Sequence, residues 1–321
     1  MLYRMDSLAP SASTTPTWSP RLPAWARSRG NDIGEADAAF TAGIALKSLD
    51  DLIRADPPWL ACWRDRLALK SAAVATKMLG RSEDETILRD AVLLTGSGDD
   101  PGPAGKLFLA TRMLTRRSGT IGSPFIKELG ELFGFRWDDA LASIPDLVDT
   151  AIQSGRAVPF VAADLIATIC ATRPDAEALA WGLADTVLAH KLNWPKLVPL
   201  LLPERFGPAF RTIGGRGRVR PGEPDYPKAV CLALIDSVGA ALRLAAEIDR
   251  RASRLLAVAP KLRTKGAEPV IRALLNEDAV AASAPGSNLS RWAANRLFDR
   301  LESFEAVREL SGRSSFRIFG L

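Results

Sequence analysis

Residue types that often carry catalytic or metal-binding chemistry are scarce in this chain of 321 residues, which has three cysteines, one histidine and two tyrosines. Cys62, Cys170 and Cys231 are odd in number, far apart and without the spacing of metal ligands, so we expect neither a disulfide framework nor a metal site. The single histidine, His190, excludes a zinc site built from several histidines. It falls on the apolar face of a predicted helix, which favours a packing role over a catalytic one. No cofactor is expected on these grounds.

The chain also lacks an uninterrupted hydrophobic segment of membrane-spanning length and an N-terminal secretory signal. Its best membrane-span candidate, residues 229–248, contains Asp236, Arg243 and Glu247, whose charges would be costly in lipid. Residues 1–30 are rich in Ser, Thr, Pro and Arg and have no periodic apolar residues, so we expect them to be disordered. Together with the cysteine usage, these absences predict a cytoplasmic protein without a membrane partner.

Strands are disfavoured through most of the chain, because alanine and leucine dominate its composition. Helix start and stop signals follow one another instead, including Ser82-Glu83-Asp84-Glu85 before one helix and Ser123-Pro124 before another. The predicted helices span 35–55, 59–79, 82–95, 103–117, 123–133, 137–154, 159–172, 175–192 and 196–205, with two or three more up to about 277. We therefore predict an all-α protein with a helical domain over 31–210, an Arg/Gly loop over 211–227, and a helical segment with a C-terminal winged-helix-like unit over 228–321.

The stretch at residues 99–106 looks at first like a phosphate-binding loop but lacks parts of that motif. Asp100 stands where the first glycine is required, and Leu107 stands where a Ser or Thr would hold magnesium. An acidic helix start braced by prolines explains the stretch better.

Positive charge is concentrated in one part of the chain. The basic and acidic counts are 23 and 25 for residues 1–210, 13 and 6 for residues 211–272, and 6 and 6 for residues 273–321. Near the start of the basic segment, arginines alternate with small residues, which leaves guanidinium groups open to phosphate. We predict that Arg216, Arg218 and Arg220 bind a phosphate-bearing partner, the alternative being a solvated surface loop.

The pattern changes after residue 288, where an amphipathic helix is predicted over residues 288–307. Its expected inner stripe is Leu289, Trp292, Ala293, Leu297, Leu301 and Phe304, and its expected outer face is Ser290, Arg291, Asn295, Asp299 and Ser303. A strand ending at Leu310, a turn at 311–314 and a strand over 315–319 follow, which predicts a short β-hairpin. A helix that leads straight into such a hairpin is typical of the end of a winged helix-turn-helix.

Two resemblances rest on these residues. Segments 296–302, 307–313 and 316–319 resemble the terminal winged helix attached to many bacterial Fic-type proteins, and Glu305 stands where that pattern usually has a helix-capping glycine. Over nearly the whole chain the sequence resembles an uncharacterised bacterial family, domain of unknown function 1403 (DUF1403). The runs that carry this second resemblance are residues 66–70, 99–105, 215–222 and 309–313. It implies no activity, and because no Fic catalytic motif occurs in the chain, AMP transfer is not implied either.

The winged-helix resemblance implies roles for four residues. Arg291 and Asn295, near the helix start, are predicted to read base edges in a major groove, and Arg313 and Arg317 to contact the DNA backbone. We therefore expect a nucleic-acid-associated protein without catalytic activity, whose partner is duplex DNA or another polyanion. Two alternatives stay open: a protein-interaction or accessory module in which the wing binds a protein, and an enzyme with a pocket in the helical domain.

Overall fold

α-Helices make up most of the computed structural model, and its strands lie near the C-terminal end of the described residues. The structure describes residues 22–26, 33–96, 98–117, 119–212, 216–262, 266–283, 289–311 and 316–321. The helices of the body are α1 (Glu35–Ala55), α2 (Leu60–Met78), α3 (Glu85–Leu93), α4 (Gly102–Arg116), α5 (Ser123–Phe133), α6 (Asp139–Ala142), α7 (Ile144–Gln153), α8 (Val158–Thr172), α9 (Glu177–Lys191) and α10 (Tyr226–Val258). Residues 266–321, which we call the C-terminal unit, contain α11 (Ala267–Asn276), β1 (Val280–Ala281), α12 (Arg291–Ser303), β2 (Arg308–Glu309) and β3 (Ile318–Gly320). The prediction of a mostly helical chain that ends in short strands is confirmed.

Local sequence signals fix several helix ends. The Asp84 side chain caps α3 by accepting hydrogen bonds from the backbone N–H groups of Thr86 and Ile87, both at 3.0 Å. Helix α5 begins at Ser123, as predicted, and is followed by Gly134, whose φ of +80° is a left-handed conformation that glycine adopts freely. These ends could be predicted because the residues that make them are neighbours in the sequence.

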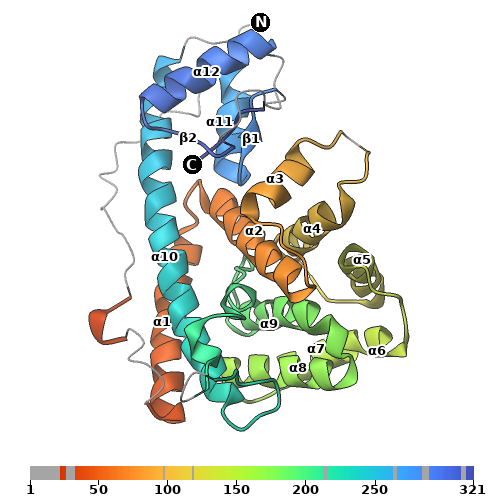
Figure 1. The fold of residues 1–321 in the computed structure, drawn as a ribbon. Coiled ribbons are helices and arrows are strands. Elements are labelled where there is room, and N and C mark those ends of the chain that lie inside the picture. The colour runs from red at the N-terminus through yellow and green to blue at the C-terminus, as the bar shows by residue number, and fades with distance from the viewer. Residues whose placement is uncertain are drawn as a thin grey trace, which may run out of the picture.

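Helix α10 forms the spine of the fold. Its 33 residues correspond to about 50 Å at 1.5 Å per residue, and α1 and α8 pack against it. Figure 1 shows α1 beside the lower part of α10 and the C-terminal unit at the opposite end of α10. By length and composition Tyr226–Lys261 is apolar enough to cross a membrane, with a mean hydropathy of 1.8, but 67% of its most apolar window is buried inside the fold. That burial is what a core helix requires.

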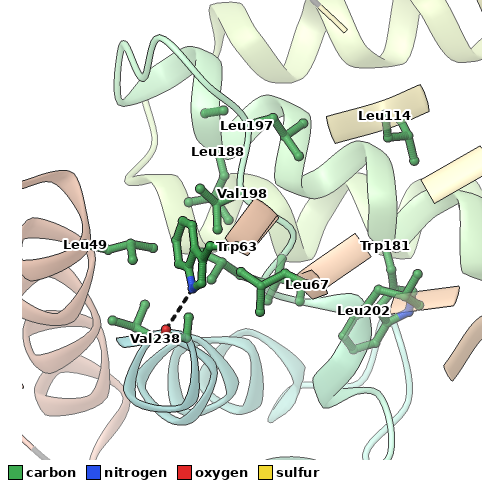
Figure 2. Packing of buried hydrophobic residues seen from close by; sticks show 14 of the residues in the cluster. Leu49, Trp63, Leu67, Leu114, Trp181, Leu188, Leu197, Val198, Leu202 and Val238 are labelled. Atoms are coloured by element: carbon green, nitrogen blue, oxygen red, sulfur yellow. Dashed lines mark hydrogen bonds between the residues drawn. The ribbon is translucent and has the colours of Figure 1, made fainter. Parts of the chain in front are cut away.

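The core of the body gathers around Trp63 of α2 (Figure 2). The indole is fully buried, and its Nε1 donates a hydrogen bond to the Ala241 carbonyl of α10 at 3.0 Å, so the polar atom keeps a partner. Around the ring in the same view lie Leu49 of α1, Val238 of α10, and Val198 from the segment between α9 and α10. The Trp63 side chain thus joins α2 to both α1 and α10.

The helix expected over residues 196–205 is wrong. Within this stretch only Leu202–Glu204 forms a short 3-10 turn. The buried carboxyl group of Asp185 accepts hydrogen bonds from the backbone N–H groups of Leu200 and Leu201, at 3.0 and 3.1 Å, so these groups have a partner outside any helix. A tertiary hydrogen bond therefore replaces the local one that the sequence suggested.

Two smaller expectations for the body also fail, and one segment is described only in part. The helix predicted over 137–154 is divided into α6 and α7, and His190 is exposed rather than packed on an apolar face. Of the N-terminal segment expected to be disordered, the structure describes residues 22–26, where Leu22 and Ala26 are buried against the body and Trp25 is exposed. Its remaining residues lie outside the described part of the chain.

The strands form one antiparallel sheet with the order β1-β3-β2. The central strand β3 is buried: Phe319 stacks on Phe298 of α12, with ring centroids 4.5 Å apart, and Ile318 clusters with its cross-strand neighbour Ala281 and with Leu93 of α3. Strand β1 lies between α11 and α12, in a stretch for which the sequence predicted no strand. Two residues are too few to show the alternating pattern by which a strand is recognised, so β1 had no signal of its own.

A buried ion cluster fastens the C-terminal unit to the body. Asp278, which precedes β1, accepts hydrogen bonds from Nε of Arg66 in α2 and Nε of Arg89 in α3, the second at 2.6 Å. Arg66 also donates to the backbone carbonyls of Asp278, at 2.7 Å, and Leu321, at 3.5 Å. Burial alone would raise the pKa of Asp278, but the two guanidinium groups hold it below its usual value. The carboxylate is therefore ionised and serves as the shared partner of both arginines.

Candidate nucleic-acid interface

Helix α12 has one face buried and the other exposed. Ser290 caps it by accepting a hydrogen bond from the Ala293 N–H at 3.3 Å, so the helix starts three residues later than expected. The buried side chains are Ala294, Leu297, Phe298 and Leu301. Of the predicted inner stripe, Leu297 and Leu301 are buried as expected.

Trp292 is the main correction to the predicted helix face. Its side chain is 68% exposed, and the guanidinium carbon of Arg296 lies 4.5 Å from the centre of its ring. Phe304, also expected inside, is 40% exposed, and the guanidinium carbon of Arg300 lies 5.9 Å from the centre of its ring. The outer face is therefore made of arginines stacked on aromatic rings, a combination that the sequence analysis missed.

Three guanidinium groups on α12 are available to a partner. Arg291, Arg296 and Arg300 are exposed and have no ion pair among the residues that the structure describes. Asn295, the second predicted base-reading residue, is half-buried. Arg291 and Asn295 are four residues apart, so they lie on one side of the helix. The predicted pair thus lies together, beside arginines that were not predicted.

Arg317 has a different environment from the one expected for a phosphate contact. Its guanidinium makes ion pairs with Asp299 and Glu302 of α12, the second at 3.1 Å, and with Glu309 of β2 at 2.9 Å. It also lies 4.6 Å from the centre of the Phe319 ring. These contacts join α12 to the sheet, and the single charge of Arg317 is shared among three carboxylates. Arg313, the other predicted backbone contact, lies outside the described residues.

The Arg/Gly loop carries the other predicted phosphate contacts, and its arginines differ. Arg216 and Arg220 are exposed. Arg218 is partly buried and donates hydrogen bonds to the backbone carbonyls of Phe206, at 2.8 Å, and Gly207, at 3.2 Å. Its side chain therefore anchors the loop, whereas Arg216 and Arg220 remain open to solvent.

The structure does not bring the two groups of predicted contacts together. The loop lies beside the start of α10, and α12 lies near the other end of that helix, as Figure 1 shows. Since α10 is about 50 Å long, one short ligand does not reach both groups. Each group must be tested by itself.

Comparison with known proteins identifies a family and no activity. A search of curated proteins gives no match. The family model described as protein of unknown function DUF1403 matches residues 10–321, nearly the whole chain. The resemblance inferred from the sequence runs is thereby confirmed: the chain belongs to the DUF1403 family.

Proposed function

We propose that the protein associates with nucleic acid through its C-terminal unit, and that α12 lies in the major groove of duplex DNA. The observation that carries the proposal is the outer face of α12, where Arg291, Arg296 and Arg300 are exposed without ion pairs in the described part of the chain. The neighbouring acidic groups Asp299 and Glu302 share an ion pair with Arg317 and Glu309, so one of these three negative charges is offset.

The arrangement of the C-terminal unit supports this proposal. Its order of helix, strand, helix and two strands, with the sheet order β1-β3-β2, is similar to that of a winged helix, with α12 in the place of the recognition helix; no helix is described between β1 and α12. The 13 residues of α12 correspond to about 20 Å, and a major groove about 12 Å wide admits such a helix. A similar fold alone does not identify the ligand, and it is the exposed guanidinium groups that favour nucleic acid.

Binding of a fluorescent random duplex to the full chain, measured by anisotropy at several salt concentrations, tests the proposal. The double variant Arg296→Ala/Arg300→Ala should weaken binding and lower the slope of log K against log salt by about 2, because two phosphate contacts are lost. Arg272→Ala is the matched control, since Arg272 is an exposed arginine of the neighbouring α11 that pairs with Glu268. A wild type that retains no duplex at low salt would refute the proposal.

Sequence preference is tested separately by selection from random duplexes. Arg291→Ala should relax a preference for guanine at one position, since a bidentate arginine–guanine contact contributes about 1–3 kcal/mol. The double variant Arg216→Ala/Arg220→Ala should weaken all sequences equally if the loop adds phosphate contacts. Arg218 stays unchanged in this experiment because it anchors the loop.

An accessory role in protein binding is the second candidate, and a specific observation favours it. Three aromatic side chains of the C-terminal unit are exposed: Trp292 at 68%, Phe304 at 40% and Phe316 at 50%. Aromatic residues are enriched at protein interfaces. If Trp292→Ala abolishes a salt-insensitive interaction while no duplex is retained, the unit binds protein instead.

A further inference from the structure

A cavity of about 580 Å³ lies where α2, α3 and α10 meet strand β2. Its volume falls in the range of small-molecule sites, which is about 300–1,000 Å³. Five of the side chains that line it are basic: Arg66, Lys70, Arg89, Arg243 and Arg308. The cavity is thus large enough for a metabolite and rich in hydrogen-bond donors.

Three guanidinium groups line one end of the cavity, and two of them share one buried carboxylate. Arg66 and Arg89 both direct Nε at Asp278, whereas Arg308 has no ion pair among the described residues. Partial burial and the like charges of Arg66 and Arg251 lower the pKa of Arg308, which means that its positive charge is destabilised by its surroundings. An anion that approached Arg308 would relieve this repulsion and accept hydrogen bonds from a guanidinium group that has no ion pair among the described residues.

The acidic side chains of the lining do not cancel this excess. Glu85 lies 3.5 Å from Lys70, and the two charges offset each other. Burial and the nearby Asp236 raise the pKa of Glu204 to about 7, so at neutral pH this group is protonated about half the time and then donates a hydrogen bond. Glu247 is exposed on α10 and is the acidic group that faces Arg308. The arginine end therefore keeps a net positive charge.

We infer that this cavity binds a small organic anion that bears phosphate or carboxylate groups. Arg308 would hold the anionic group directly, and Arg66 and Arg89 would contribute positive potential from behind it. Glu204 also lines the cavity and offers a polar contact to a hydroxyl group of the same ligand. Because Arg308 belongs to β2, the ligand would bridge the C-terminal unit and the body.

Isothermal titration of the full chain at constant ionic strength tests the inference, with pyrophosphate and citrate as probes. We expect saturable binding of at least one probe, and the stronger of the two identifies phosphate or carboxylate as the preferred group. Arg308→Met should raise the Kd of the more tightly bound probe by about ten- to a hundredfold, because charge-assisted hydrogen bonds are lost. Arg272→Met, on α11 outside the cavity, should leave Kd within twofold. Absence of saturable heat with both probes, or an unchanged Kd in Arg308→Met, overturns the inference.

The thermal midpoint without ligand separates a binding role of Arg308 from a structural one. Removing a charge that its neighbours repel should keep or raise the midpoint of Arg308→Met, while ligand binding is lost. Kd is measured at a temperature at which every variant is folded, so it stands independently of the midpoint. A lower midpoint together with an unchanged Kd would make Arg308 a structural residue. The titration contains no nucleic acid, so its result is independent of the DNA-binding proposal.

Discussion

Replacing Asp278 by asparagine tests what holds the C-terminal unit on the body. The change keeps the size of the side chain but removes the carboxylate that pairs with Arg66 and Arg89, both of which are buried. Removing one partner of a buried ion pair lowers the free energy of unfolding by about 3–5 kcal/mol, because the remaining charge stays in a medium of low polarity. At roughly 2 °C for each kcal/mol in a chain of this size, the thermal midpoint should fall by about 6–10 °C.

Urea unfolding followed by tryptophan fluorescence measures this loss, as a lower midpoint with an unchanged slope. Glu277→Gln is the matched control: it changes the adjacent residue, whose half-exposed carboxylate pairs with Arg112 and Arg116. Ion pairs with an exposed partner contribute about 0–1 kcal/mol. If Asp278→Asn shifts the midpoint no further than Glu277→Gln does, the ion cluster does not hold the unit in place.

Acid titration gives an independent check on Asp278. Because its pKa is lower in the folded state, its contribution is fully present above the unfolded pKa of about 3.9 and is lost as the pH falls through the folded pKa. Wild-type stability should therefore fall more steeply than that of Asp278→Asn between about pH 5 and pH 2. Parallel curves would show that Asp278 is not ionised in the fold.

Three further changes test separate features. Burial raises the pKa of Asp185 to about 8, so its contribution to the stability of the fold is full below the unfolded pKa of about 3.9 and declines as the pH rises toward 8. Asp185→Asn should remove this decline from thermal midpoints recorded over pH 4–8, and an equal slope in the variant would contradict the prediction. Gly320→Ala should lower the free energy of unfolding in urea by about 1–3 kcal/mol, because the added Cβ would lie 2.7 Å from the Asp278 carbonyl oxygen. A change below about 0.5 kcal/mol would refute this. Glu305→Gly should leave stability unchanged or raise it by about 1 kcal/mol, since relief of the positive φ of 52° outweighs the exposed ion pair with Arg254, and a clear loss in the same assay would contradict it.

Helices could be predicted from the sequence where their start and stop signals are local. The prediction failed where a residue distant in the sequence determines the backbone conformation. Residues 123–133 were assigned correctly because the proline lies in the first turn of the helix, although the N-cap residue is Gly122 and not Ser123. The stretch 99–106 also behaves as expected: Asp100 accepts the Gly102 N–H at 2.8 Å and pairs with Lys106, as a helix start does. By contrast, the backbone near residue 200 follows Asp185, a partner in another helix that no local pattern reveals.

The candidate interface was only partly predictable, because α12 offers two apolar stripes. The predicted inner stripe contained Trp292 and Phe304, whereas the face that is buried contains Ala294 and Phe298. In the fold, the stacking of Phe298 on Phe319 selects the second stripe and turns Trp292 outward. At Glu305, where the winged-helix pattern usually has a helix-capping glycine, the backbone has a positive φ of 52°.

The buried ion cluster also has a consequence for the order in which the protein is made. Asp278 follows Arg66 by 212 residues and Arg89 by 189, so at 5–20 residues per second the ribosome delivers the carboxylate about 10–40 s after the arginines. During that interval both guanidinium groups need water, and α2 and α3 therefore cannot reach their final burial. The earliest helices are completed by one of the last segments to be translated, and a chain cut short before residue 278 carries exposed, unfinished core that quality-control proteases recognise.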